Sequence, residues 1–186
     1  MSAVDAPGAD GRAVESALAF AERSPDTTRS RTITWQDPLP AAAAGARLSG
    51  REYVEAIRSG ELPPPPIAVV MNMAMVELSD GKAVFEGDPG EEHYNPIGVV
   101  HGGYASTLLD SALGCAVHTT LDAGFAYTSL TLEAKFVRPI TRDTGRVRAE
   151  AEVVHRGRTQ ATAEALLVAA ETGKLLATGT STCLII

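Results

Sequence analysis

Residues 95–110 have the sequence Asn-Pro-Ile-Gly-Val-Val-His-Gly-Gly-Tyr-Ala-Ser-Thr-Leu-Leu-Asp, in which a histidine and two glycines precede an apolar run. From Gly102 to about Thr120 the chain is rich in Ala and Leu, follows a helical period and contains no proline. The run is apolar on more than one face, which is typical of a helix buried by surrounding structure. The sequence therefore predicts a long central helix.

Strand patterns lie on both sides of this helix. Residues 67–78 and 82–87 flank the turn sequence Ser-Asp-Gly at residues 79–81, which predicts a hairpin. Four runs after the helix alternate with a period of two: residues 127–138, 145–155, 159–169 and 174–185. Tight turns are expected at residues 156–158 and 171–173, so these four strands are predicted to form an antiparallel meander. The predicted class is α+β, with a sheet that curls around the helix.

The first part of the chain has a different composition. Residues 1 to about 30 are mostly polar, with a short apolar patch at residues 14–20, which predicts a flexible leader. The alternation of Arg31–Trp35 predicts a short strand or an extended arm. Ser49 as N-cap, Glu52 three residues later and Gly60 as a stop predict a helix over residues 49–59.

Four prolines at residues 63–66 predict a stiff connector into the following segment. The expected organisation is therefore an N-terminal extension over residues 1–64 and a core domain over residues 65–186.

The composition narrows the classes of function. The net charge is −7, from 16 Lys and Arg against 23 Asp and Glu, which argues against nucleic acid as a partner. Cys115 and Cys183 have no metal-ligand spacing and stand among apolar residues, so both are expected to be core residues. No signal peptide and no stretch long enough to span a membrane is found, so a cytoplasmic protein without metal or cofactor is expected.

The glycines at the start of the central helix could bind and polarise the carbonyl group of a ligand. Gly102 and Gly103 allow close approach of a ligand, and the N–H groups of a first helical turn point outward at the positive end of the dipole. His101 suits either an acid–base role or a structural hydrogen bond, and Asn95 either a second donor or a turn. A plain loop-to-helix transition would also use these residues.

Asp110 is the most distinctive polar residue of the helix. It lies next to Leu108, Leu109 and Ala112, where an unpartnered carboxylate would cost several kcal/mol, so an exposed position or a function is expected. It follows Gly102 by eight residues, about 12 Å along a helix. One reaction can use both groups only if they come from two chains, which predicts a homodimer with two shared sites.

These motifs together resemble one known family. His-Gly-Gly at residues 101–103 with an Asp nine residues after the His, and a later strand ending in Arg138-Pro139, resemble the hot-dog-fold thioesterases of the phenylacetate-pathway (PaaI-like) type. The resemblance covers residues 65–186. It implies a curved antiparallel sheet wrapped around the central helix, dimers joined edge to edge, and often dimers of dimers.

The resemblance also implies roles for individual residues in the hydrolysis of an acyl-CoA. Gly102, helped by Asn95, would polarise the thioester carbonyl, and His101 would support the turn. Asp110 of the partner chain would act as general base or nucleophile. A hydroxyl near the start of the following strand would assist it, with Ser129 the best match and Thr128 or Thr131 the alternatives.

The expected substrate-binding site includes more residues than the catalytic groups. The acyl pocket would lie between the helix and the partner's sheet. Residues expected to contact the substrate or its phosphates are Gly103, Tyr104, Leu108, Thr128, Thr131, Arg138, Arg142, Arg156, Arg158 and the methionines Met71, Met73 and Met75. The extension has no counterpart in the minimal family domain, and the sequence leaves open whether it covers the acyl pocket or the sheet.

Three other functions compete with hydrolysis. A dehydratase or hydratase would show a His paired with an acid in a different motif, which the sequence lacks. A non-catalytic acyl-CoA sensor would bind the thioester without cleaving it. A purely structural protein is disfavoured by the acid in the central helix.

Overall fold

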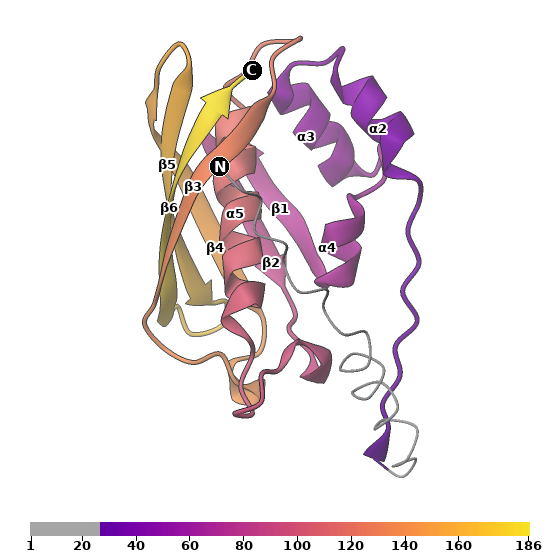
Figure 1. Cartoon of the computed structure of the whole chain (residues 1–186), viewed down its shortest axis with the longest axis vertical. Helices are drawn as coiled ribbons and strands as arrows, with labels where there is room; N and C mark the ends of the chain where they lie inside the picture. The colour runs from indigo at the N-terminus through magenta and orange to yellow at the C-terminus, as the bar shows by residue number, and fades with distance from the viewer. Residues whose placement is uncertain (1–26) are drawn as a thin grey trace, which may run out of the picture. The chain divides into compact units, whose positions relative to one another are not determined.

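The computed structural model describes residues 27–186 (Figure 1). The chain divides into two compact units, residues 1–33 and 34–186, and all the helices and strands discussed below belong to the second. Most of the predicted flexible leader, including its apolar patch at residues 14–20, lies outside the described residues. No strand forms at Arg31–Trp35, so of the two predicted alternatives the strand was wrong.

Six antiparallel strands form one sheet. The strands are β1 (Met73–Ser79), β2 (Lys82–Gly87), β3 (Tyr127–Phe136), β4 (Val147–Arg156), β5 (Gln160–Ala169) and β6 (Leu175–Ile185). Their order across the sheet is β1-β2-β4-β5-β6-β3, and all pairs are antiparallel. The predicted hairpin and the predicted strand positions are confirmed to within two residues, except at the start of β1.

The predicted four-stranded meander was wrong in one pairing. Strands β4, β5 and β6 follow one another through tight turns, but β3 pairs with β6 and not with β4. The chain from β3 to β4 is not a tight turn: it includes the 3₁₀ turn η3 (Arg142–Thr144) and passes the residues before the central helix, where Val100 N–H donates to Ile140 O at 2.9 Å. This longer connection crosses to the other side of β5 and β6 and leaves β3 at the edge.

The central helix α5 (Gly102–His118) packs along one face of the sheet, as predicted (Figure 1). Leu108, Leu109 and Leu113 have no exposed surface. Small residues on the inner face of the sheet allow the close approach, since a Cβ at Gly179 would lie only 3.2 Å from Leu109 Cδ2. The α+β hot-dog arrangement, a sheet around one helix, is therefore confirmed.

Two helices lie beside β1: α3 (Gly50–Ser59) in the extension and α4 (Pro66–Val70) just after it. A third helix, α2 (Pro38–Gly45), contacts α3. The predicted helix α3 is confirmed, with a Ser49–Glu52 capping box and Gly60 at φ 84° as its end. Helix α2 was missed, although Asp37 caps it and Pro38 occupies its first turn. The start of the first predicted strand was wrong, because Pro66 begins helix α4 and β1 begins only at Met73.

In residues 27–186, no helix has both the length and the apolar content needed to cross a membrane.

Candidate active site

The N-terminus of α5 is organised by His101. Its Nδ1 accepts a hydrogen bond from Gly103 N–H at 2.8 Å, and its carbonyl oxygen accepts from Tyr104 N–H at 3.0 Å. The Nδ1 atom is therefore an acceptor, and the neutral ring carries its proton on Nε2. Among the described residues, this leaves the Gly102 N–H as the first-turn donor with no protein acceptor.

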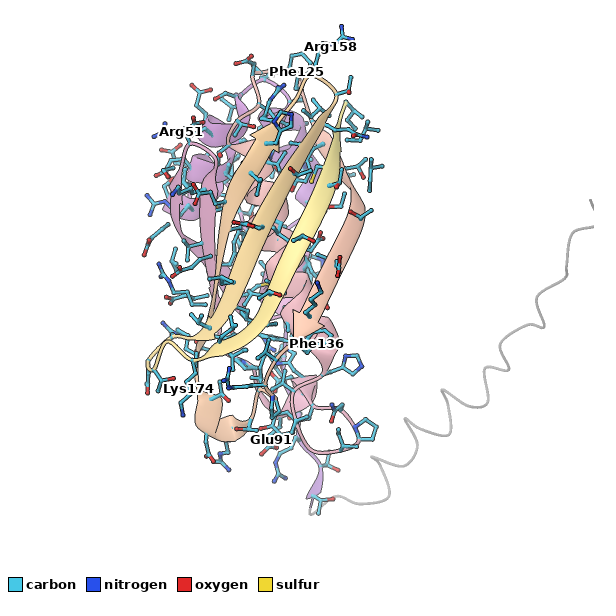
Figure 2. The ribbon with its side chains drawn as sticks, turned by 90° about the vertical axis from the view of Figure 1, so that its left-hand side faces the viewer. Arg51, Glu91, Phe125, Phe136, Arg158 and Lys174 are labelled. Atoms are coloured by element: carbon cyan, nitrogen blue, oxygen red, sulfur yellow. The ribbon has the colours of Figure 1, made fainter. Side chains whose placement is uncertain are left out.

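A side chain at Gly102 would require the exposed ring of Phe136 to shift by a few tenths of an ångström. A Cβ there would lie 3.1 Å from Phe136 Cζ, so a larger residue would push against the ring at the end of β3. Phe136 itself lies at the end of this edge strand (Figure 2). Gly102, Phe136, Arg138 and Leu176 border a cavity of about 320 Å³ next to the helix N-terminus. Arg138 is fixed there by donating from Nη1 to Leu175 O at 2.7 Å.

Asn95 shapes the loop that leads into α5. Its Oδ1 accepts from Ile97 N–H at 3.1 Å and from Val99 N–H at 3.3 Å, which is the behaviour of a turn residue. The Nδ2 amino group is the donor end of this fixed amide. The turn alternative is therefore confirmed, and it orients a donor without excluding the ligand-binding role.

His93 belongs to the same region, although the sequence analysis missed it. Its Nδ1 accepts from Gly90 N–H at 3.0 Å, and its ring lies 4.7 Å from the ring of Tyr104. His93 also holds the next histidine, since His101 N–H donates to His93 O at 2.8 Å. No local pattern distinguishes this histidine from a surface residue, because its contacts come from a 3₁₀ turn, η2 (Glu91–His93).

Tyr104 is a core residue that borders the site. It is 3 % exposed, and with Met71, His93 and Thr107 it borders an open hollow of about 400 Å³. The three methionines do not share one strand as expected. Met71 ends helix α4, while Met73 and Met75 lie in β1.

Asp110 lies in the middle of α5, eight residues after Gly102, and is partly buried. Its Oδ1 accepts a hydrogen bond from Ser129 Oγ at 3.1 Å. The strand β3 is irregular between Ser129 and Thr131, and Thr131 faces away, accepting from Thr182 N–H at 3.2 Å. Thr128 is opposite Leu184 on that same outer face. Of the three candidate hydroxyls, Ser129 is the one that contacts Asp110.

The surroundings of Asp110 are desolvated. Burial raises the pKa of the Cys115 thiol to about 12, and the charge of Asp110 contributes to this rise. Burial also raises the pKa of Tyr127 well above its usual value, with smaller contributions from Cys115, Cys183 and Asp110. Asp110 therefore lies near two desolvated groups that stay neutral at pH 7.

The expected site residues thus fall into two groups within one chain. One group surrounds the N-terminus of α5 and includes Asn95, His101, Gly102, Gly103, Tyr104 and Arg138. The other is the Asp110–Ser129 pair, about 12 Å further along the helix. The described residues contain no cluster of three His, Cys, Asp or Glu side chains that could hold a metal ion.

Comparison with known proteins identifies the family to which this fold belongs. The family model described as "Thioesterase superfamily" matches residues 97–176. The human protein "Acyl-coenzyme A thioesterase 13" is 32 % identical over 114 residues, which cover 61 % of this chain and 80 % of that protein. The mouse protein of the same name is 29 % identical over 114 residues.

Solved structures of similar proteins have the same fold. A phenylacetic acid degradation-related protein from Ralstonia eutropha JMP134 aligns with a TM-score of 0.64 and 29 % identity, covering 71 % of this chain and 98 % of that one. A mutant of the phenylacetic acid degradation protein PaaI from Thermus thermophilus aligns with a TM-score of 0.58 and 30 % identity, covering 64 % and 98 %. The fold, together with these comparisons, defines a hot-dog protein of the thioesterase type. The chain belongs to the thioesterase superfamily.

Proposed function

We propose that this chain hydrolyses an acyl-CoA thioester to the free acid and coenzyme A. The observation that carries the proposal is the carboxylate of Asp110, which accepts a hydrogen bond from Ser129 at the centre of a mostly apolar helix. Membership of the thioesterase superfamily and the names of the mammalian relatives support the same reaction and the same substrate class.

The reaction requires a second copy of the chain, and the surface of β3 supports one. Among the described residues, this ten-residue strand pairs on one side only, with β6. Its apolar side chains include the exposed Leu130, Leu132 and Phe136, at 50 %, 39 % and 58 %. An open strand edge with apolar side chains is a template for pairing with another strand. We infer that β3 pairs with β3 of a second copy.

A two-fold axis near the middle of β3 brings the two groups of site residues together. Ser129 lies near one end of β3 and Phe136 at the other. Antiparallel pairing sets the Ser129 end of one strand beside the Phe136 end of its partner. Asp110 contacts Ser129, and Gly102 adjoins Phe136, so Asp110 of one chain approaches the helix N-terminus of the other.

The chemistry then follows from the two half-sites. The Gly102 N–H of one chain donates to the thioester carbonyl oxygen, and the Asn95 amide is placed on the same loop to add a second donor. Asp110 of the other chain either removes a proton from an attacking water or attacks the carbonyl carbon itself. The tetrahedral intermediate collapses, the C–S bond breaks, and the thiolate of coenzyme A leaves and takes up the proton that came from the water. On the nucleophilic route the acyl group is first held on Asp110 as an anhydride, and a water then cleaves this anhydride, which releases the acid, restores the carboxylate and supplies the proton. Ser129 keeps the carboxylate in position.

Two substitutions test the shared site. Asp110→Asn removes the base or nucleophile. Gly102→Pro removes the N–H donor at the first helical position, where proline is well tolerated and where His101, at ψ 138°, has the extended backbone that proline requires before it. Each variant alone is expected to lose on the order of 10²-fold or more in kcat, measured as free-thiol release from short, medium, long and aromatic acyl-CoAs.

Co-expression of the two variants with different tags distinguishes shared from separate sites. A heterodimer carries one intact site and one doubly mutated site, so an equal mixture is expected to regain roughly a quarter of the wild-type activity. No regain would contradict the shared site. Bound acyl-CoA without thiol release by the wild type would contradict the hydrolase and favour an acyl-CoA sensor.

A further inference from the structure

Helix α3 of the extension is fixed against the C-terminal end of α5 (Figure 1). Gly50 N–H donates to Leu121 O at 2.9 Å, just beyond the end of α5. A Cβ at Gly50 would overlap the carbonyl oxygen of His118, so the two helices meet with backbone against backbone. Val54 of α3 is 2 % exposed. The extension is therefore a packed part of the hot-dog unit at this point.

Three rings continue from α3 across the end of α5 to β3. The Tyr53 ring lies 5.6 Å from the His118 ring, and the His118 ring lies 5.3 Å from the Tyr127 ring, both edge to face. Tyr53 is held from its other side by α2, because a Cβ at Gly45 would lie 2.5 Å from its Cε2. All three rings are partly exposed, so the row forms a wall with an accessible side.

This aromatic row begins next to the reactive carboxylate. Tyr127 is two residues before Ser129 in β3, and both face α5. The Tyr127 hydroxyl lies against Gly114, one turn of α5 beyond Asp110. Cys115 follows Gly114 in α5 and lies between Asp110 and His118 along the helix. Burial raises the pKa values of Tyr53 and Cys115 and lowers that of His118, so these groups are neutral at pH 7.

A thioester held at Asp110 has two unequal ends. The coenzyme A end carries phosphates, which need water or cations, and the cavity at the helix N-terminus offers both an opening and Arg138. The acyl end needs an apolar, dehydrated surface. The neutral rings beyond Asp110 suit the acyl group and do not suit phosphates.

We propose that Tyr53, His118 and Tyr127 form the closed end of the acyl site, so that the N-terminal extension sets an upper limit on the length of the acyl group. The inference rests on the proposed hydrolysis and adds to it a specificity residue, Tyr53, that lies outside the segment matched by the family model. The extension covers the acyl pocket in this arrangement.

The test uses the full-length dimer and a series of straight-chain acyl-CoAs from acetyl to palmitoyl. Tyr53→Leu keeps an apolar side chain against His118 but shortens the wall. It is expected to shift the best substrate to a longer chain, with kcat/KM gaining about fourfold for each additional methylene that becomes buried. Tyr53→Phe keeps the ring and is expected to keep the wild-type profile. Arg51→Ala, on the exposed side of the same helix, controls for general effects on α3.

The outcomes separate the two proposals. Hydrolysis by wild type with the same chain-length profile in Tyr53→Leu would overturn the wall and leave the hydrolase intact. No hydrolysis of any member by wild type would overturn both. A uniform loss of activity at every chain length in Tyr53→Leu, with a lowered Tm, would show a structural role for Tyr53 and also overturn the wall, because a specificity residue changes the ratio between substrates.

Discussion

The two edge strands of the sheet, β1 and β3, differ in whether other elements of the chain pack beside them. At the β1 edge, helices α3 and α4 of the same chain pack beside the strand. At the β3 edge, Leu130, Leu132 and Phe136 stay exposed, and among the described residues no element pairs with the outer side of the strand. One edge is thus closed by the chain itself, while the other has the apolar surface of an unfinished interface.

The difference teaches where the chemistry can occur. Asp110 and Ser129 lie toward the open edge, and so does the Gly102 contact with Phe136. At the closed edge, Tyr53 of α3 contacts His118 at the end of the helix that carries Asp110. In the arrangement that we propose, a second copy completes the reactive end of the site, and the extension closes the other.

The largest effect is expected from a charge on the open edge. Leu132→Lys places an ammonium on the helix-facing side of β3, where pairing with a second copy would bury it. The variant is expected to be monomeric by analytical ultracentrifugation and to lose on the order of 10²-fold or more in kcat, because each monomer lacks the other half-site. Its fold should persist, since Leu132 is 39 % exposed in the single chain.

Leu166→Lys is the matched control. Leu166 is 50 % exposed on β5, in the interior of the sheet and on its outer face. The same substitution there is expected to leave the shared sites and the activity in place. A dimeric and active Leu132→Lys variant would show that the open edge is not the interface.

Much of this fold could be predicted because its signals are local. The helix α3 carries its own capping box in Ser49 and Glu52, and α5 is recognisable as a buried helix from its composition alone. The pairing of β3 with β6 has no such signal, since it depends on how a ten-residue connection passes the helix N-terminus. Helix α4 has only five residues, too few to show a period.

The candidate site divides in the same way. His101, Gly102 and Asp110 could be selected from their positions in one helix, whose geometry is known in advance. The sequence alone does not show which of Thr128, Ser129 and Thr131 faces Asp110, because the register of β3 shifts between Ser129 and Thr131. The contact between Tyr53 and His118 joins residues 65 positions apart (118 − 53), and neither residue is unusual in its own segment. Such contacts arise only when packing brings distant segments together.

A smaller effect is expected at the closed edge from Gly50→Ala. Alanine is the better helix former, so local propensity alone would stabilise α3 by about 1 kcal/mol. The added methyl group would instead overlap the His118 carbonyl oxygen and force α3 away from α5. We expect a net loss of about 1–3 kcal/mol in the free energy of unfolding, and a Tm lower by several degrees.

Thermal unfolding of Gly50→Ala and of Arg51→Ala, one position further along α3, isolates the docking contribution. Arg51 is exposed, so its substitution should change the Tm little. An unchanged or higher Tm in Gly50→Ala would mean that α3 is not held against α5, and the contrast between a closed and an open edge would fail.

The smallest expected effect is the pH dependence that His118 gives to the closed edge. Burial between Tyr53 and Tyr127 lowers the pKa of His118 from its usual 6.5. Above pH 6.5 the ring is neutral in both the folded and the unfolded chain and contributes no pH dependence. As the pH falls below 6.5, the unfolded chain takes up the proton first, so the free energy of unfolding decreases, by at most about 1.4 kcal/mol per pH unit.

Urea unfolding at pH 7.5, 6.5 and 5.5 should show this decrease in wild type and a smaller one in His118→Gln. The lowered pKa of Glu52 acts in a separate window below pH 4.5, so it does not contribute over this range. Equal slopes for wild type and His118→Gln would mean that water reaches the ring freely, and a wetted ring could not form the closed end of an acyl site.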